Sequence, residues 1–401
     1  MPEFPPSAHS TLPQDGAAGA LVGRVWRPDL GGPSVVAVRE DGVHDVTAGF
    51  PTVRDLCESE DPAGALRVAT GEYLGDLDAL LANTPVDTRD PARPWLLAPV
   101  DLQVIKAAGV TFAISMLERV IEERTGGDAG GASAVRAGIG TLLGGDLADL
   151  RPGSPEAAEL KKMLIDQGLW SQYLEVGIGP DAEIFTKAPV LAAVGTATDA
   201  GIHPDSRWNN PEPEVVLAVA STGRIVGATL GNDVNLRDVE GRSALLLPKA
   251  KDNNASAAVG PFLRLFDPGF GLDDVRTATV TLTVDGADGH HLDGDSSMTQ
   301  ISRDPEDLVA QLLGPHHHYP DGAALYLGTM FAPIQDRDAD GQGFTHHVDD
   351  IVTVSTPTLG ALVNRIRTSD TCEPWAFGIA DLLRNLAGRG VLQGPAPGSG
   401  G

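Results

Sequence analysis

The stretch WNNPEPEVVLAV, Trp208–Val219, places two glutamates directly before an apolar run with the length and composition of a buried strand. Side chains two positions apart in a strand point to the same face of a sheet, so Glu212 and Glu214 bring two carboxylates to one place. Packed together without a cation, carboxylates repel one another, and burial raises their pKa values. The pair therefore predicts a cation site at the start of this strand.

A third carboxylate follows the next apolar run. The segment STGR, Ser221–Arg224, has turn composition and should fold the run IVGATLGNDV back against the first strand, which brings Asp233 beside the pair. Three carboxylates form an all-oxygen site that suits Mg²⁺, with Mn²⁺ as the alternative. On spacing alone, a solvated strand edge also explains two glutamates at these positions.

Composition restricts the function of the chain. Its 401 residues contain 55 Asp and Glu against 29 Lys and Arg, a formal net charge of −26, which disfavours nucleic acid and anionic membranes as partners. No window approaches the ~18 apolar residues of a membrane helix, and the N-terminus lacks the pattern of a signal peptide. Cys57 and Cys372 have no metal or disulfide spacing. We expect a soluble cytoplasmic protein whose partner is a small molecule.

The pattern of strands, helices and turns predicts an α+β protein with a mixed β-roll or barrel as catalytic domain, a smaller β-rich N-terminal domain and a connecting helical segment. The tails are rich in Pro, Gly, Ser and Ala, which predicts disorder. The predicted divisions are a disordered tail 1–17, an N-terminal domain 18–100, a catalytic domain 101–392 (helical entry 110–175, β-rich core 178–365, C-terminal helix 374–388) and a disordered tail 393–401.

Five motifs occur in the order of a known family. They are AEIFTKAP (Ala182–Pro189), NNPEPEVVLAV, GNDVNLRD (Gly231–Asp238), KAKDNNASAAVGP (Lys249–Pro261) and YLGTM (Tyr326–Met330). Together they resemble the core pattern of the fumarylacetoacetate hydrolase superfamily, over roughly residues 100–390.

The resemblance implies a role for particular residues. Glu212, Glu214 and Asp233 are similar to the metal ligands of the family, Lys251 to its active-site lysine and Thr329 to its substrate-contacting threonine. It also implies a mixed β-roll, commonly assembled as a homodimer or homotetramer.

One departure points to a branch of this superfamily. Its carbon–carbon bond hydrolases activate water with a histidine that follows a GxNYxxH-like segment, whereas the corresponding segment here is GVTFAISMLERVIEER, and no histidine occurs between His44 and His203. The sequence more closely resembles the sugar-acid branch, namely 2-keto-3-deoxy-D-xylonate (2-dehydro-3-deoxy-D-pentonate) dehydratases. An elimination needs only a group that removes a proton beside a ketone and a group that protonates the departing hydroxyl.

The expected reaction is therefore metal-dependent dehydration of a 2-keto-3-deoxy-pentonate, by enolate formation and loss of the carbon 4 hydroxyl, to 2,5-dioxopentanoate. Glu183 resembles the active-site glutamate of this branch and is the expected acid/base. Lys251 would support the enolate or bind the substrate carboxylate, and a Schiff base on it is a second possibility. A hydrolase or decarboxylase of acylpyruvates, or a sugar-acid-binding protein without activity, are the alternatives.

Some residues keep two interpretations. Lys187 could contact substrate or simply extend from a strand end. The histidines of PHHHYP, His316–His318, and of THHVDD, His346 and His347, could bind a transition metal, but consecutive residues cannot all face one ion in regular structure. Polar loop histidines are the other interpretation. The segment QDRDADGQG, Gln335–Gly343, lacks the closing glutamate of an EF-hand calcium loop.

Overall fold

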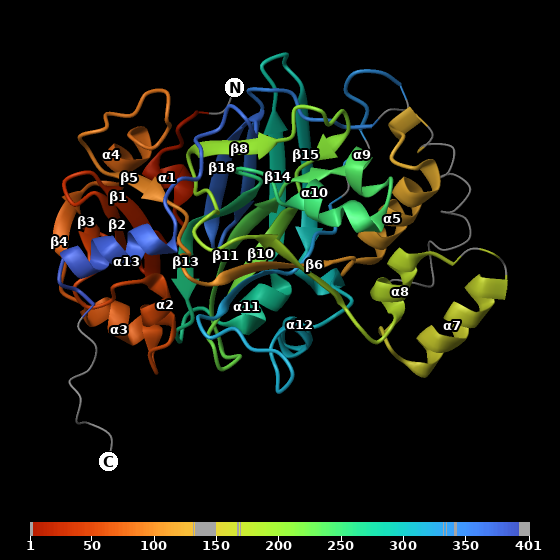
Figure 1. The fold of residues 1–401 in the computed structure, drawn as a ribbon, viewed down its shortest axis with the longest axis horizontal. Helices are drawn as coiled ribbons and strands as arrows, with labels where there is room; N and C mark the ends of the chain where they lie inside the picture. The colour runs from red at the N-terminus through yellow and green to blue at the C-terminus, as the bar shows by residue number, and fades with distance from the viewer. Residues whose placement is uncertain are drawn as a thin grey trace.

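The computed structural model describes residues 3–130, 132, 150–166, 168, 170–331, 333, 335–340 and 343–392. Helices and strands are mixed along this part of the chain, and two sheets pack against each other around the main apolar core (Figure 1). This arrangement confirms the predicted α+β class.

The larger sheet has eleven strands. They are β1 Leu21–Arg27, β2 Gly32–Arg39, β3 Gly42–Asp45, β4 Glu72–Gly75, β5 Trp95–Leu97, β6 Val104–Gly109, β7 Glu183–Ala188, β10 Pro213–Val219, β11 Ile225–Asp233, β13 Ala257–Leu265 and β16 Ala323–Tyr326. Their order is β4-β3-β2-β1-β13-β11-β10-β16-β6-β7, with β5 on β1. Leu21 and Val22 of β1 pair with Arg264 and Leu263 of β13, so the predicted N-terminal domain and catalytic domain share one sheet.

Strand β10 explains the apolar run of the opening motif. All seven of its residues are buried, because both faces of the sheet are covered here. Val215, Leu217 and Val219 face the main core between the two sheets, whereas Val216 packs on the other face in a cluster that includes Tyr326. A strand buried on both faces needs continuous rather than alternating apolar residues.

The predicted hairpin between β10 and β11 is present. The amide of Ala220 donates to the carbonyl of Arg224 over 2.9 Å, and Gly223 takes a φ of +85°, a conformation that glycine adopts without strain. Glu214 pairs with Gly231 in register, and the amide of Asp233 donates to the carbonyl of Glu212 over 3.0 Å. This register brings the three carboxylates together.

The smaller sheet contains five strands in the order β15-β14-β17-β18-β8 and covers the inner face of β10, β11 and β13. Its core residues alternate along β14, where Val280, Leu282 and Val284 are buried. The strands are β8 Thr198–Ile202, β14 Thr279–Asp285, β15 His291–Ser297, β17 Ile351–Thr356 and β18 Gly360–Thr368, and a separate two-stranded ladder joins β9 Asn209–Asn210 to β12 Asn235–Leu236.

Three helices, at the right of Figure 1, form the predicted helical segment: α5 Ala113–Thr125, α7 Pro155–Asp166 and α8 Gln172–Ile178. The hydroxyl of Ser154 accepts a hydrogen bond from the amide of Ala157 over 3.1 Å, so Ser154 caps the N-terminus of α7. The apolar residues of these helices pack mainly on one another, in a cluster that the β-roll joins through Trp208 and Val110. The segment therefore has a small core of its own.

Other helices cover the outer surfaces. Helix α13, within the predicted C-terminal helix 374–388, lies beside β2, where the Arg389 guanidinium donates to the carbonyl of Pro33 over 2.7 Å (Figure 1). The helices are α2 Val53–Cys57, α3 Pro62–Val68, α4 Leu77–Ala82, α9 Arg237–Glu240, α10 Leu247–Lys251, α11 Leu272–Thr277, α12 Pro305–Leu312 and α13 Ile379–Gly388, with 3₁₀ turns Ala244–Leu246 and Met298–Gln300.

The N-terminal segment differs from its prediction. Residues 3–17, expected to be disordered, contain helix α1 Ala8–Thr11, which packs on β18 and α4. Phe4 packs against the cluster of Ile351, Ala361 and Val363, so tertiary contacts order a segment whose composition alone favours disorder. The predicted tail 393–401 lies outside the described residues. Among the described helices, none is long and apolar enough to cross a membrane.

Candidate active site

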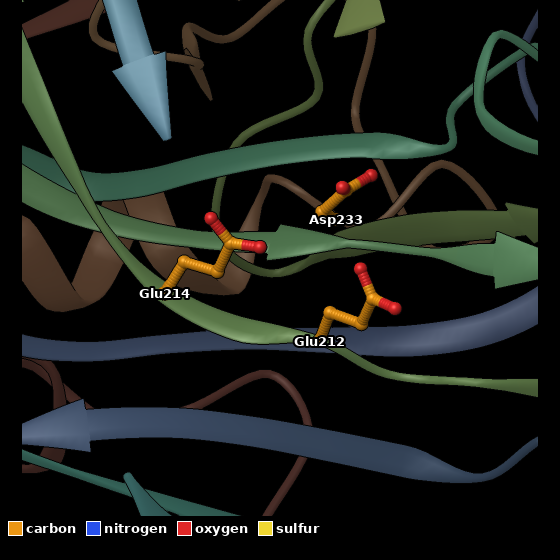
Figure 2. A group of neighbouring side chains, drawn as sticks. All are labelled: Glu212, Glu214 and Asp233. Carbon is orange, nitrogen blue, oxygen red and sulfur yellow. The ribbon is translucent and has the colours of Figure 1, made fainter. Parts of the chain in front are cut away.

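The three predicted carboxylates meet at the paired ends of β10 and β11. Glu212 directly precedes β10, Glu214 is its second residue, and Asp233 ends β11. One oxygen from each lies within 4.8 Å of the others, and all three side chains are buried (Figure 2). No other group of three possible metal ligands occurs in the described part of the chain.

Three cationic side chains surround this triad. Lys251 Nζ lies 2.5 Å from Glu212 Oε2 and 2.8 Å from Asp233 Oδ2, and Lys187 Nζ lies 2.8 Å from Asp233 Oδ1. The Arg119 guanidinium, from α5, contacts Glu212. Glu212 and Asp233 therefore each contact two cationic side chains.

The charges set the protonation of the triad. Burial opposes ionisation of Asp233, but Lys187 and Lys251 outweigh it and lower the pKa of its carboxyl. Burial would lower the pKa of Lys251, but Asp233 and Glu212 raise it above the ordinary range. Glu214 pairs with no cationic side chain of the described residues, and burial together with the neighbouring Asp233 raises its pKa well above the usual value. One carboxyl of the three thus lacks compensation.

The donor set fits a small divalent cation. It consists of carboxylate oxygens only, as Mg²⁺ and Mn²⁺ prefer, and the nearby backbone amide of Gly328 donates to Glu214 Oε2 over 2.6 Å, which orients that carboxylate. A divalent ion would supply the positive charge that Glu214 lacks. Gly328 has a φ of +91°, and a Cβ there would lie 2.0 Å from the Thr111 hydroxyl, so glycine is required.

Glu183 lies at the start of β7 and lines the same small cavity as the triad. Burial raises the pKa of its carboxyl, although Arg119 and Lys251 oppose the shift. Gly109, its partner across the ladder with β6, leaves room for this side chain, because a Cβ on Gly109 would lie 2.2 Å from Glu183 Oε2. A carboxyl group in this position can act as acid or base.

The cavity contains most of the predicted residues. Thr329 lines it and is buried, and its hydroxyl accepts a hydrogen bond from the amide of Phe331 over 3.0 Å. The free space is about 20 Å³, enough for an ion or a water molecule beside the triad. The lining residues are Ala108, Gly109, Val110, Ser115, Arg119, Glu183, Phe185, Glu212, Glu214, Asp233, Glu240, Lys251, Gly328 and Thr329.

Lys187 does not line this cavity. It is fully buried behind Asp233, and its ammonium group donates to the carbonyls of Val234, over 3.1 Å, and Lys251 and to the hydroxyl of Ser256. Its four oxygen partners place it as a support for Asp233 rather than beside a substrate.

Two charged residues of the cavity were missed by the sequence interpretation, Arg119 and Glu240. Arg119 NH1 lies 2.7 Å from Glu122 and 3.0 Å from Glu240, so α5 and α9 meet at its guanidinium. The signal for Arg119 was its place among glutamates in ERVIEE, on a helix whose other faces pack against apolar neighbours.

A second arginine joins α5 to the roll. The Arg237 guanidinium of α9 donates to Glu118 over 3.0 Å and to Glu122 over 2.6 Å, and it stacks on the Trp208 ring at 4.2 Å. All four residues are buried. Buried ion pairs, together with Trp208, thus attach the helical segment beside the cavity.

The described histidines of the two motifs do not line the cavity of the triad. His316, His317 and His318 are exposed, whereas His346 is buried, with Nδ1 3.3 Å from Asp350 Oδ2, and His347 lies 2.9 Å from Asp338. Neither group joins three ligands in the described residues.

No protein-family model matches the chain. Among curated proteins, it is similar to a probable 2-keto-3-deoxyxylonate dehydratase of Haloferax volcanii, with 30% identity over 83% of this chain and 95% of that protein. It is also similar to a 2-dehydro-3-deoxy-D-arabinonate dehydratase of Saccharolobus solfataricus, with 28% identity over 46% of this chain, and that match spans 58% of the relative.

Solved structures show the same fold. A 2-keto-3-deoxy-D-arabinonate dehydratase complexed with magnesium and 2,5-dioxopentanoate superposes with a TM-score of 0.57 at 18% identity, over 87% of this chain and 99% of that one. A fumarylacetoacetate hydrolase of Exiguobacterium antarcticum gives a TM-score of 0.50 at 14% identity, over the same shares. These structures confirm the predicted mixed β-roll of the fumarylacetoacetate hydrolase type.

Proposed function

The chain belongs to the sugar-acid dehydratase branch of the fumarylacetoacetate hydrolase superfamily, and from this premise we propose that it is a metal-dependent hydro-lyase that converts a 2-keto-3-deoxy-pentonate to 2,5-dioxopentanoate. The relative that it matches over most of its length is named as a dehydratase of this kind.

One observation carries the proposal: the cavity combines an all-oxygen cation site with Lys251 and Glu183 and has no histidine among its lining residues. A hydrolase of this fold needs a base that activates water, and imidazole is the usual one. An elimination can proceed with carboxyl groups, which this cavity does supply.

Glu212, Glu214 and Asp233 would hold the cation, with Mg²⁺ preferred over Mn²⁺ for oxygen ligands. When bound, the ion would supply Lewis-acid polarisation of the substrate's 2-keto group. A magnesium complex of a protein with the same fold supports this choice.

The protein groups perform the remaining steps. Glu183, whose pKa burial raises, takes the proton from carbon 3. Lys251 is held beside the triad and places a positive charge where negative charge develops on the 2-keto oxygen or remains on the substrate carboxylate. Thr329 offers its hydroxyl at the cavity wall for a hydrogen bond to the substrate.

The proposal includes a homodimer or homotetramer in the cytoplasm. Two free, buried cysteines are compatible with a reducing compartment. Size-exclusion chromatography with light scattering measures the assembly, and a monomeric mass at working concentration would contradict this part.

Purified protein with Mg²⁺ should form 2,5-dioxopentanoate from 2-keto-3-deoxy-D-xylonate or its arabinonate epimer, and no product from an acylpyruvate. Removal of the metal with EDTA should stop turnover, and added Mg²⁺ should restore it. Loss of a group that only supports a metal ligand costs about 10–100-fold, so Glu214→Gln, which alters a ligand itself, should cost more. Cleavage of the acylpyruvate with no semialdehyde from either pentonate would sink the dehydratase assignment.

A further inference from the structure

Glu240 is a second buried carboxyl group of the cavity besides Glu183, outside the metal triad. It ends helix α9, is 3% exposed, and lines the same cavity as Glu183 and Lys251. The two carboxyl groups come from different elements, because Glu183 begins strand β7. The cavity therefore offers a substrate two acid/base groups.

The contacts of Glu240 distinguish it from the structural carboxylates nearby. Glu122 accepts hydrogen bonds on both oxygens, from Arg237 over 2.6 Å and from Arg119 over 2.7 Å. Glu240 Oε2 lies 3.0 Å from Arg119, but no residue in the described ranges donates a hydrogen bond to it. The ion pair with Arg119 therefore lacks a well-aligned hydrogen bond, which leaves this buried oxygen able to accept one from a bound molecule.

Burial also suits this group to proton transfer. It raises the pKa of Glu240 to about 7, against the opposing effect of Arg119 and Lys251 and with a further upward contribution from Glu122 and Glu212. An acid with a pKa near the working pH is half protonated and can both donate and accept, which is the optimum for general acid–base catalysis.

The proposed reaction needs more than one proton donor and acceptor. The C3–H bond breaks, the C4–O bond breaks with a proton added to the leaving hydroxyl, and water departs, which leaves a C3=C4 double bond. Formation of 2,5-dioxopentanoate then requires removal of a proton from carbon 5 and its replacement at carbon 3, before the C4=C5 enol becomes the aldehyde by exchange with water. Protons thus move at carbon 3, at the carbon 4 hydroxyl and at carbon 5.

We propose that Glu240 is a catalytic residue that protonates the departing C4 hydroxyl and then takes the proton from carbon 5, whereas Glu183 takes the C3 proton and returns it there. This inference rests on the proposed function. Each carboxyl group then ends the cycle in its starting protonation state, and the sum is loss of one water from the substrate, with no oxidant or reductant.

Proton exchange separates the two roles. The test incubates 2-keto-3-deoxy-D-xylonate and Mg²⁺ in D₂O with each of four proteins and follows the reaction by proton NMR. The proteins are the wild type, Glu240→Gln, Glu240→Asp and Glu183→Gln. Glu240→Gln should form product at least about 100-fold more slowly but still exchange the C3 protons of intact substrate for deuterium. Glu183→Gln should lose both reactions.

The conservative variant and the pH profile add a second readout. Wild-type kcat should fall as the pH rises through about 7, because the acid form of Glu240 is then lost. Glu240→Asp keeps an ionisable group and should retain this alkaline limb, whereas the residual rate of Glu240→Gln should lack it.

Two results would overturn the assignment. If Glu240→Gln dehydrates the substrate at the wild-type rate, this carboxyl group transfers no proton. Equal loss of dehydration and C3 exchange in Glu240→Gln, with Mg²⁺ affinity by calorimetry unchanged, shows a role in substrate placement instead. Absence of product from wild-type protein is a separate outcome that contradicts the proposed function itself, and this inference with it.

Discussion

The ammonium group of Lys187 is surrounded by oxygen atoms, with Asp233 Oδ1 at 2.8 Å and no exposure to the cavity. Removal of one partner of a buried ion pair leaves an uncompensated charge, which costs about 3–5 kcal/mol. Because Asp233 keeps Lys251 at 2.8 Å, Lys187→Met should lower the free energy of unfolding by no more than this amount in the presence of EDTA. Mg²⁺ should restore part of it, because the ion binds the folded site only. Urea unfolding followed by circular dichroism measures both values.

Lys106→Met is the matched control, since Lys106 is another strand lysine, and its ammonium group has one described hydrogen bond, to Thr186 over 3.0 Å. It should change stability by less than about 1 kcal/mol. An unchanged unfolding energy for Lys187→Met together with a raised KM would contradict the structural role and restore the alternative, a contact with substrate.

For single residues, sequence motifs identify the site residues that lie on neighbouring strands joined by a short turn. Glu212, Glu214 and Asp233 could be brought together from alternation and one turn, because a hairpin has few possible registers. The contact between Arg119 and Glu240 could not be predicted in this way. The two residues lie about 120 positions apart and meet because α5 docks on α9, and sequence spacing carries no information about that docking. The proposed roles of the individual residues remain predictions.

For helix α5, too, the sequence predicts one part of the packing and not the other. Its three- and four-residue apolar period predicts a helix, and Met116, Val120 and Ile121 do pack on α8 and its neighbours. Its attachment to the β-roll depends instead on charged residues of another face. Glu118 and Glu122 pair with Arg237. Arg119 pairs with Glu212 and Glu240. An amphipathic pattern indicates that one face is buried but does not reveal that the polar face is buried too.

Arg237→Met should detach this helix. Glu118 and Glu122 would lose a cation that lies 3.0 Å and 2.6 Å away, and all three side chains are buried. The free energy of unfolding should fall by about 3–5 kcal/mol, and α5 amides should lose protection in hydrogen exchange before those of β10. Mass spectrometry of deuterium uptake in peptides from both elements measures the difference.

Arg242→Met tests whether any arginine near α9 has this effect. Arg242 is exposed, and no carboxylate of the described residues pairs with it, so its loss should change stability by no more than about 0.5 kcal/mol. Protection of α5 that is the same in Arg237→Met and wild-type protein would show that apolar packing alone holds the helix.

For the whole molecule, apolar patterning predicts the class and the roll, because each strand must be buried on one face or both. It does not predict that β1 joins β13, more than 200 residues away, since neither strand encodes its partner. The prediction of disorder for the N-terminal segment fails for the same reason. Its Pro- and Ser-rich composition lacks a core of its own, whereas the surface made by β18 and α4 supplies one.

Removal of residues 1–17 tests whether this segment is part of the fold. The Asp15 carboxylate accepts two hydrogen bonds from Arg264, over 3.0 and 2.6 Å, and the amide of Gln14 donates to the carbonyl of Pro357 over 2.8 Å. Arg264 is buried, and a buried donor left without a partner costs about 1–3 kcal/mol, so the truncated protein should unfold at a lower temperature and urea concentration. Deletion of residues 393–401, whose composition offers little apolar surface, is the control and should leave both midpoints unchanged. Equal midpoints for the two truncations would show that the segment is dispensable, as its composition alone predicts.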